Sequence, residues 1–235
     1  APLQQASQRY GVQQEYILAL WGMESSFGYY QGSYDVLSAL ATLAFDGRRE
    51  ALFSKEFIAA MKMLQRDHIQ RHKMRGSWAG AMGQTQFMPS SYLRYAADGN
   101  GDGEKNIWTE HYDVFASIAN YLHTEGWNPN LPWGVEVTVN QPIDMALSGT
   151  EEGKQRRLTD WQNRGVSLKF QTPETQQKLT ALSQTDLWLV RPDRELGRAF
   201  LVSNNYRTLL HWNKSNYFAV SIGMFADRIQ QRMGN

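Results

Sequence analysis

The spacing of apolar residues changes twice along the chain, from helical to alternating and back to helical. Three N-terminal segments carry apolar residues three and four positions apart, which predicts amphipathic helices. The apolar residues are Ile17, Leu20 and Trp21 within 3–23, then Phe53, Phe57, Ala60, Met61 and Leu64, then Phe115, Ile118, Ala119 and Leu122. No repeat accompanies these segments.

Alternation predicts strands in the middle of the chain, at Val135, Val137 and Val139 and again over 166–170. Two further strand candidates are 187–190 and 199–202, and helical spacing returns at Phe218, Ile222, Phe225 and Ile229. We therefore expect an α+β protein with three parts. These are a mainly helical core over 1–133, a small antiparallel β lobe over 134–202, and C-terminal helices over 203–235 that return to the core.

Charge and cysteine content exclude several functions. The 24 Lys and Arg residues nearly cancel the 23 Asp and Glu residues, so the chain lacks the field that would attract nucleic acid. There is no cysteine, which excludes disulfides, thiolate zinc sites and a cysteine nucleophile. No apolar run reaches the ~18 residues of a spanning helix, and the polar start predicts that no signal peptide is present.

Glu24 is the first candidate catalytic residue. It follows Trp21, Leu20 and Ile17 by three, four and seven positions, so it shares their helical face. Gly28 is a plausible helix stop, which places the carboxylate at the negative end of the helix. Partial burial and this dipole both favour the protonated form, which suits a general acid. The alternative is a structural Glu that caps a turn or pairs with an arginine.

The segment 76–92 is rich in glycine, small residues, amides and hydroxyls. It lacks both the phosphate-loop ending and the dinucleotide fingerprint, so nothing supports phosphate binding. Small residues let the backbone approach a ligand closely, and Ser77, Gln84 and Gln86 could hydrogen-bond sugar hydroxyls or acetamido groups. The alternative is a tightly packed turn between helices.

A possible metal loop begins at Asp98. Asp98, Asn100, Asp102 and the following Gly103 reproduce the first half of an EF-hand, in which Glu104 would contribute its backbone carbonyl. The pattern predicts a hard cation, although Thr109 stands where the standard loop has a glutamate. The alternative is a polar turn without metal. Earlier in the chain, His68 continues the apolar face of its predicted helix and is expected to be a hydrogen-bonded core histidine. The basic residues 71–73 are expected to form a solvated turn.

Several motifs together resemble the lytic murein transglycosylase B family, and their order and spacing agree with it. The matching segments are 22–28, 38–45, 80–83, 86–92, 98–103, 119–121 and 213–215. The resemblance covers essentially the whole chain. It implies a lysozyme-like fold with an EF-hand-like loop and a cleft for peptidoglycan glycan strands. The implied activity is cleavage of the β-1,4 bond between N-acetylmuramic acid and N-acetylglucosamine, which leaves 1,6-anhydromuramic acid ends.

The resemblance also implies roles for individual residues. Glu24 matches the catalytic acid and base. Three residues match polar positions that line the family's cleft, namely Ser77, Gln86 and Asn213. Tyr121 matches an aromatic residue of the cleft, and the alternative is that it is a tyrosine on the surface of its helix. The calcium ligands implied are Asp98, Asn100, Asp102, Glu104 and Asp113. Calcium would be structural, and no cofactor would be required for catalysis. Trp212 and Phe218 depart from the family, which has tyrosine at both positions.

One carboxylate suffices for this reaction because the C6 hydroxyl of muramic acid is the nucleophile, whereas hydrolases usually need two. Asp35 and Asp46 are the candidate second carboxylates, and both are expected to be turn or cap residues. The rival functions are a lysozyme-type or chitinase-type hydrolase and a non-catalytic peptidoglycan-binding protein. The resemblance implies that the chain lies in the bacterial periplasm and that its full-length precursor is associated with the outer membrane. It also implies that proteins of cell-wall synthesis or remodelling are partners.

Overall fold

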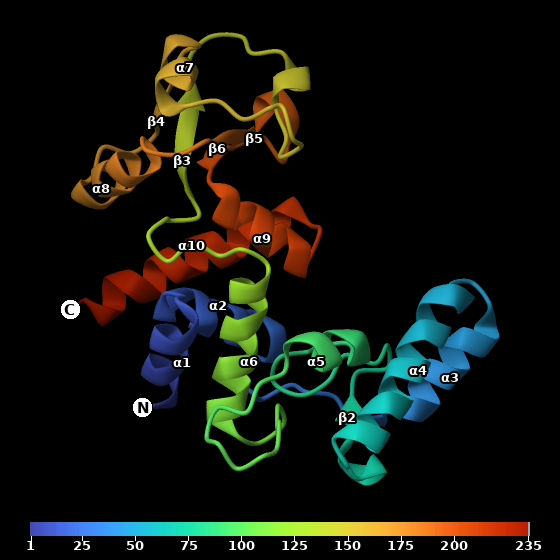
Figure 1. Ribbon diagram of the computed structural model, residues 1–235. Coiled ribbons are helices and arrows are strands. Elements are labelled where there is room, and N and C mark those ends of the chain that lie inside the picture. Colours follow the sequence, from blue (N-terminus) through green and yellow to red (C-terminus); the bar gives the residue numbers. More distant parts are fainter. Residues whose placement is uncertain (235) are drawn as a thin grey trace. The chain divides into compact units, whose positions relative to one another are not determined.

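The structure is a computed structural model that describes residues 1–234. It is mainly helical (Figure 1). Its α-helices are α1 (Pro2–Tyr10), α2 (Gln14–Ser25), α3 (Val36–Asp46), α4 (Glu50–Arg66), α5 (Pro89–Tyr95), α6 (His111–Thr124), α7 (Leu158–Asn163), α8 (Pro173–Leu182), α9 (Asn204–Trp212) and α10 (Asn216–Met233). Its strands are β1 (Tyr34–Asp35), β2 (Arg75–Gly76), β3 (Gly134–Val139), β4 (Val166–Leu168), β5 (Trp188–Val190) and β6 (Ala199–Val202). Short 3-10 turns are η1 (Arg71–Lys73), η2 (Met145–Leu147) and η3 (Arg194–Leu196).

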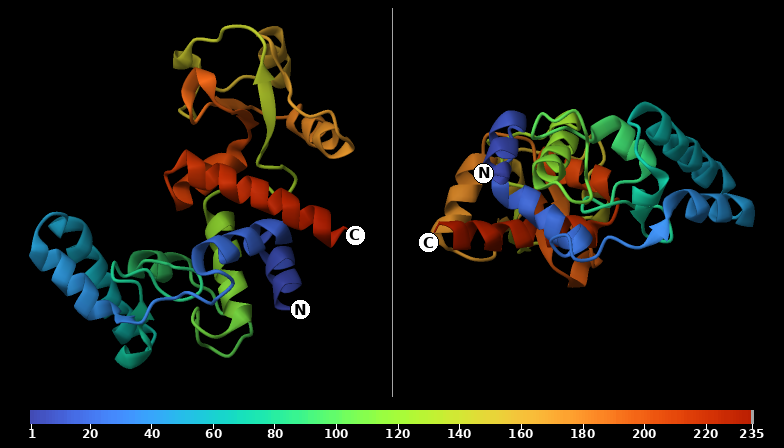
Figure 2. Two further views of the ribbon diagram at one scale, coloured as in Figure 1. Left: turned by 180° about the vertical axis from the view of Figure 1, so that it is seen from behind. Right: turned by 90° about the horizontal axis from the view of Figure 1, so that it is seen from below.

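The chain forms two compact units. Unit 1 contains Ala1–Thr124 and the chain from Arg228 onward, and unit 2 contains Glu125–Asp227. Figure 2 shows the helical path of unit 1 and the short strands of unit 2 from two further sides. The expected β lobe, 134–202, lies entirely within unit 2, whereas the expected C-terminal helices are divided between the units.

Two helices replace the single N-terminal helix expected over 3–23. Gly11 adopts a left-handed conformation, with φ 66°, and ends α1, because glycine enters this region without steric cost. Helix α2 then ends at Ser25, one residue after Glu24, which confirms the predicted end. The predicted third helix, α6, is also confirmed and packs against α1 and α2. Its apolar residues Phe115, Ile118, Ala119 and Leu122 are all buried.

Helix α4 is confirmed, but its buried face is only partly the predicted one. Met61 is 49% exposed, while Met63 and Glu56 are buried. Glu56 holds the start of α5, because its carboxylate accepts hydrogen bonds from the backbone N–H and the hydroxyl of Ser90, at 2.9 and 2.5 Å. The expectation that His68 lies in the core is wrong. His68 follows the end of α4 with φ 53° and is exposed.

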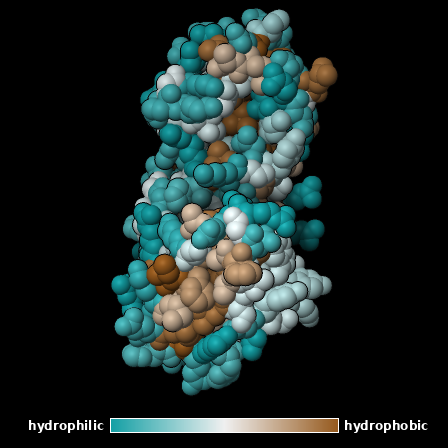
Figure 3. Space-filling model, turned by 90° about the vertical axis from the view of Figure 1, so that its right-hand side faces the viewer, coloured by the Kyte–Doolittle hydropathy of each residue, from teal (hydrophilic) through white to brown (hydrophobic). Residues whose placement is uncertain are grey.

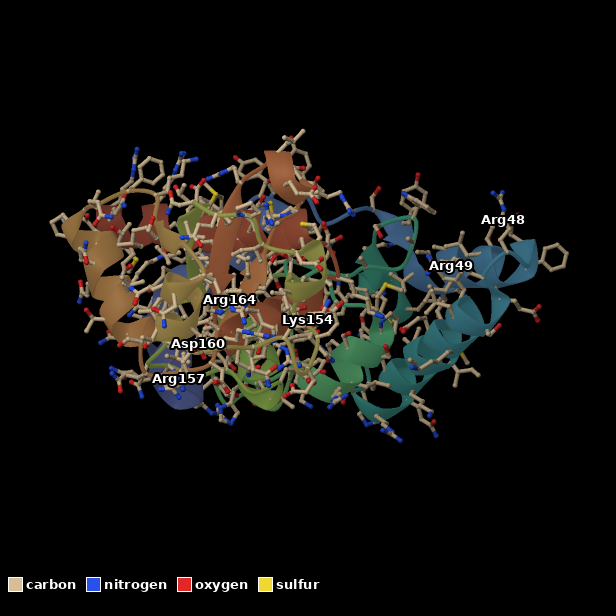
Figure 4. The ribbon with its side chains drawn as sticks, turned by 90° about the horizontal axis from the view of Figure 1, so that it is seen from above. Arg48, Arg49, Lys154, Arg157, Asp160 and Arg164 are labelled. Atoms are coloured by element: carbon tan, nitrogen blue, oxygen red, sulfur yellow. The ribbon has the colours of Figure 1, made fainter. Side chains whose placement is uncertain are left out.

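Helices α3 and α4 pack against each other as a hairpin with an exposed apolar area. Phe45 is 95% exposed at its free end, and Ile58 and Met61 are about half exposed along α4. Figure 3 shows apolar residues gathered over this part of unit 1. Arg48 and Arg49 lie at the same end of the hairpin (Figure 4).

Unit 2 is built on a four-stranded antiparallel sheet of order β4-β3-β6-β5. The four predicted strands are therefore confirmed. The alternating residues Val135 and Val137 are buried against Trp161 of α7, which is fully buried, and against Leu189 and Leu201. Full burial of one such aliphatic side chain stabilises the fold by about 1.5–3 kcal/mol. The sheet and α7 thus form a core that belongs to unit 2 alone.

Candidate active site

Glu24 lies in the last turn of α2 and is partly buried. Leu20 and Ile17, four and seven residues earlier, are fully buried, as the helical spacing predicted. Met23 and Phe27, on either side of Glu24 in sequence, are 43% and 48% exposed. The carboxylate therefore sits at the boundary between the core of unit 1 and its surface, beside the negative end of a helix.

The residue after Glu24 fixes the end of α2 to the Gly-rich loop, 76–92. Ser25 is 1% exposed, and its hydroxyl donates to the backbone oxygen of Gln84 at 2.8 Å. The same Oγ accepts a hydrogen bond from the backbone N–H of Gly28 at 3.0 Å. Because an OH group both donates and accepts, Ser25 joins the loop and the turn after α2 through one atom.

Gln84 completes this connection with its side chain. Its Oε1 accepts a hydrogen bond from Trp21 Nε1 at 2.8 Å, and its Nε2 donates to the backbone oxygen of Trp108 at 2.9 Å. Gln84 is 5% exposed, so the expectation that it contacts sugar is wrong. A Cβ atom at Gly28 would lie 2.5 Å from Gln84 Oε1, which explains the glycine at this position.

The Gly-rich loop holds Ser77 in a half-buried position. Ser77 follows β2, which pairs with β1 in an antiparallel ladder. Its Oγ accepts hydrogen bonds from the backbone N–H groups of Ala79 and Ala81, at 3.2 and 3.1 Å. Both bonds use the oxygen as acceptor, so the hydroxyl hydrogen remains available to a ligand.

Gln86 lies at a left-handed position of the same loop, with φ 54°. Its Nε2 donates to the backbone oxygens of Gly83 and Gln31, at 2.9 and 3.1 Å. These two bonds orient the half-buried amide, and no group within residues 1–234 donates a hydrogen bond to its Oε1. Gln86 can therefore offer an oriented acceptor.

Tyr121 and Asn213 occupy different surroundings. Tyr121, on α6, is 6% exposed, and its ring lies 4.1 Å from that of Tyr95 and 6.0 Å from that of Phe87. Tyr121 is therefore largely enclosed by the aromatic cluster. Asn213 belongs to unit 2, where it is exposed directly after α9 and its Oδ1 accepts a hydrogen bond from the backbone N–H of Ser215 at 3.1 Å. The structure thus brings Glu24, Ser77, Gln86 and Tyr121 into one unit.

Tyr217 lies directly before Phe218, in the segment where this chain departs from the family's tyrosines. It is 62% exposed, and its hydroxyl donates to Asp193 Oδ1 at 2.5 Å. This hydrogen bond, together with the neighbouring charge of Asp193, raises the pKa of Tyr217. The hydroxyl is therefore tied to a carboxylate of unit 2.

Of the two other candidate carboxylates, Asp35 is a cap residue as expected, whereas Asp46 is the last residue of α3 and forms an exposed ion pair. Asp35 is the N-cap of α3 and accepts a hydrogen bond from the backbone N–H of Ser38 at 3.3 Å. Its carboxylate also pairs with Arg71 at 2.7 Å. Asp46 pairs with Arg48 at 3.0 Å, and both side chains are largely exposed. The hydrogen bond from Arg71 is the main reason why the pKa of Asp35 is lowered to about 2.

Replacing Asp35 with asparagine is expected to reduce stability at neutral pH and to matter less in acid. The folded-state pKa of about 2 lies below the unfolded value of ~3.9, so the carboxylate stabilises the fold above pH ~4. This contribution is lost as the pH falls through about 2. Urea unfolding of both proteins at pH 7 and pH 2.5 measures the difference, and a difference that persists unchanged at pH 2.5 contradicts the assignment.

Three carboxylates of the predicted metal loop converge. Asp98, Asp102 and Asp113 each offer an oxygen, and these oxygens lie within 4.8 Å of one another. Asp113 is fully buried in the first turn of α6 and accepts hydrogen bonds from the backbone N–H groups of Gly99 and Asn106, at 2.7 and 2.8 Å. Burial, and to a lesser degree the charges of Asp98 and Asp102, raise the pKa of Asp113.

This set of oxygens fits a hard divalent cation, which prefers carboxylate and carbonyl ligands. Asp98 accepts hydrogen bonds from Gly101 and Gly103, which hold its two oxygens in place and lower its pKa. The other predicted ligands are exposed. Asn100 is hydrogen-bonded to Asp102, and the backbone N–H of Glu104 donates to Asp102 as well. The EF-hand-like completion of the loop stays a prediction.

The chain is similar to known proteins over nearly all of its length. A model of the transglycosylase SLT domain family matches residues 1–227. The membrane-bound lytic murein transglycosylase B of Escherichia coli is 31% identical over an alignment of 227 residues, and the match covers 94% of this chain and 58% of the relative. The chain thus spans about three fifths of that relative's length.

Solved structures show the same fold. SltB3 from Pseudomonas aeruginosa, in complex with NAG-anhNAM-pentapeptide, is 38% identical with a TM-score of 0.88, covering 98% of this chain and 60% of SltB3. The Escherichia coli lytic transglycosylase Slt35, in complex with calcium, is 28% identical with a TM-score of 0.81, covering 100% of this chain and 71% of Slt35. The expected lysozyme-like α+β fold is thereby confirmed.

Proposed function

The chain belongs to the transglycosylase SLT domain family, and from that premise we propose that it is a peptidoglycan lytic transglycosylase. Its reaction is cleavage of the β-1,4 bond between N-acetylmuramic acid and N-acetylglucosamine. The observation that carries the proposal is the position of Glu24 at the core boundary, within the region matched by the family model. SltB3 has been solved with both NAG-anhNAM-pentapeptide and NAG-NAM-pentapeptide, which supports the substrate class.

Glu24 acts first as the acid and then as the base. Its proton passes to the glycosidic oxygen as the bond from that oxygen to C1 of muramic acid breaks. The acetamido oxygen of the same sugar stabilises the positive C1. The Glu24 carboxylate then takes the proton of the C6 hydroxyl, and O6 bonds to C1. The attack is intramolecular and therefore has an entropic advantage, and no second carboxylate is needed.

The hydrogen bonds around Glu24 support this double role. Ser25 and Gln84 fix the end of α2, so that one carboxylate can face both reacting oxygens without rearrangement of the helix. Ser77 would donate its free hydroxyl hydrogen to the glycan, and Gln86 would accept from a hydroxyl or acetamido N–H. Tyr121 and Asn213 are proposed as further substrate contacts.

We assign calcium to the loop as a structural ion. Asp98, Asp102 and Asp113 supply the converging oxygens, and Asn100 and the backbone carbonyl of Glu104 complete the proposed set. When bound, the cation would neutralise the repulsion among these carboxylates. The proposal is supported by the calcium complex of Slt35. Glu24 runs both proton transfers itself, so calcium is not assigned a catalytic step.

The proposed location is the bacterial periplasm, where peptidoglycan lies. Among the helices of the described residues, none combines the length and the apolar character needed to cross a bilayer. The Escherichia coli relative is membrane-bound, which supports the association of a precursor with the outer membrane. Glycan strands are the proposed partner, together with proteins of cell-wall synthesis or remodelling.

Mass spectrometry of digested peptidoglycan tests the proposed reaction. We expect fragments with 1,6-anhydromuramic acid ends, because the C6 hydroxyl replaces water as the nucleophile. Fragments one water heavier, with reducing ends, would instead identify a lysozyme-type hydrolase. Intact glycan in both digestion and zymography would identify a non-catalytic binding protein.

A further inference from the structure

A cavity of about 430 Å³ lies in unit 1 outside the residues assigned to the reaction. One wall follows the end of α4, from Asp67 to Lys73, and the other is the loop from Gly103 to Thr109. The described residues that line it do not include Glu24, Ser77 or Gln86. Small-molecule sites enclose ~300–1,000 Å³, so the cavity can accept a group of one or two amino acids.

Two aromatic residues, of which Tyr92 is buried, make part of the cavity wall rigid. Tyr92 of α5 is 1% exposed, and its ring lies 6.2 Å from that of Trp108. The Tyr92 hydroxyl donates to the backbone oxygen of Lys105 at 3.0 Å, and this hydrogen bond holds the loop from Gly103 to Thr109 against α5. Burial, reinforced by the charge of Asp67, raises the pKa of Tyr92, so the hydroxyl stays neutral.

The cavity offers charges of both signs. Lys73 and Lys105 line it, and neither forms an ion pair within residues 1–234. Asp67 and Glu104 line it as well. An ammonium group without a carboxylate partner favours an anionic ligand, and Lys105 is half-buried, so less water screens its charge. The cavity therefore suits a ligand with both a carboxylate and an ammonium group.

We propose that this cavity binds the charged end of a peptide stem carried by the glycan strand, an inference that rests on the proposed function. Peptide stems bear free carboxylates, and a stem that ends in diaminopimelate also bears an ammonium beside one of them. Lys73 and Lys105 hold the carboxylate, and Asp67 and Glu104 hold the ammonium. N-acetylglucosamine has no charge to meet either pair, and the lactyl carboxylate of peptide-free muramic acid has no ammonium beside it.

The consequence is that the stem contributes to binding and not to bond breaking. No residue of the cavity is assigned to proton transfer, so its loss raises KM for stem-bearing strands and leaves kcat unchanged. Cleavage of strands from which the peptides have been removed is unaffected. The cavity thus sets a preference between two substrates of the same reaction.

Calorimetric titration with a free tripeptide, L-Ala-γ-D-Glu-meso-diaminopimelate, tests the proposal at fixed calcium and low salt. The double variant Lys73→Met and Lys105→Met is expected to bind it at least ~10-fold more weakly than the wild type, with an unchanged melting temperature. Lys62→Met is the matched control, because Lys62 is an exposed lysine of α4 that does not line the cavity. It should bind the tripeptide like the wild type.

A second variant examines the acidic side. Glu104→Gln, at an exposed loop position, is expected to weaken the tripeptide and to leave unchanged the binding of the same peptide acetylated at its diaminopimelate amine. Equal tripeptide binding by the double variant and the wild type would overturn the proposal. Equal losses of tripeptide and of the neutral disaccharide di-N-acetylchitobiose would overturn it too, because the cavity would then be a sugar site.

The titration is independent of the proposed reaction. The tripeptide contains no glycosidic bond, and Glu24→Gln is expected to bind it with wild-type affinity. If the wild type binds the tripeptide in the cavity but leaves the glycan uncut, the proposed function fails and the site remains. If it cuts the glycan and the lysine variants bind the tripeptide normally, only the cavity assignment fails.

Discussion

Glu24→Gln is expected to reduce glycan cleavage by at least ~10²–10⁴-fold, the usual contribution of general acid and base catalysis. The amide keeps the volume of the side chain but cannot give a proton to the glycosidic oxygen or take one from the C6 hydroxyl. Release of anhydromuramic products from purified peptidoglycan measures the rate. Strand binding, measured by co-sedimentation with the sacculus, should remain because Ser77 and Gln86 are untouched.

The matched control is Glu50→Gln, the same chemical change at an exposed position in the first turn of α4. It should cleave glycan like the wild type. A Glu24→Gln protein with more than about a tenth of wild-type turnover would show that another group performs the proton transfers.

Calcium is expected to raise the melting temperature in proportion to the logarithm of its concentration once the loop begins to saturate. An affinity of ~10⁻⁴–10⁻³ M, typical of extracellular modules, gives about 1.4–2.7 kcal/mol of stabilisation at ~10 mM calcium. For a protein of this length the corresponding shift is ~3–10 °C. The physical reason is that Asp98, Asp102 and the buried Asp113 bring three carboxylates together.

The test compares wild type with Asp98→Asn and Asp102→Asn combined, in a calcium titration followed by thermal melting. Asp186→Asn is the control, because Asp186 is an exposed carboxylate of unit 2. Equal shifts in the double variant and the wild type would place the ion elsewhere. Loss of cleavage in chelator at a temperature where the fold persists would contradict a purely structural ion.

Periodicity predicted helix α6 and strand β3 where the structure has them. The four predicted apolar residues of α6 are buried, but α6 also buries its other sides, including Asp113 and Ser117. The buried face of helix α4 was predicted only in part, because some of its buried surface consists of Glu56, whose carboxylate is hydrogen-bonded by Ser90. Such a pairing depends on a contact distant in sequence and leaves no periodic signal.

The sequence predicted the candidate catalytic residue and a cap but not the hydrogen bonds that hold the site. The position of Glu24 at a helix end followed from local spacing, and Asp35 was expected as a cap from its residue type. The structural roles of Ser25 and Gln84 were missed, because both depend on tertiary hydrogen bonds. The one available signal was a small hydroxyl residue directly after the acid, at a position where a helix ends.

Unit 1 is assembled from two stretches of chain that are synthesised at different times. Its last portion, from Arg228, lies beyond the whole of unit 2 in the chain, within the continuous helix α10. A ribosome adds ~5–20 residues per second, so the first 124 residues emerge roughly 5–20 s before this portion is synthesised. During that interval the helical segment lacks the end of α10, which belongs to unit 1. Unit 1 therefore reaches its full set of residues only after the whole β lobe has been synthesised.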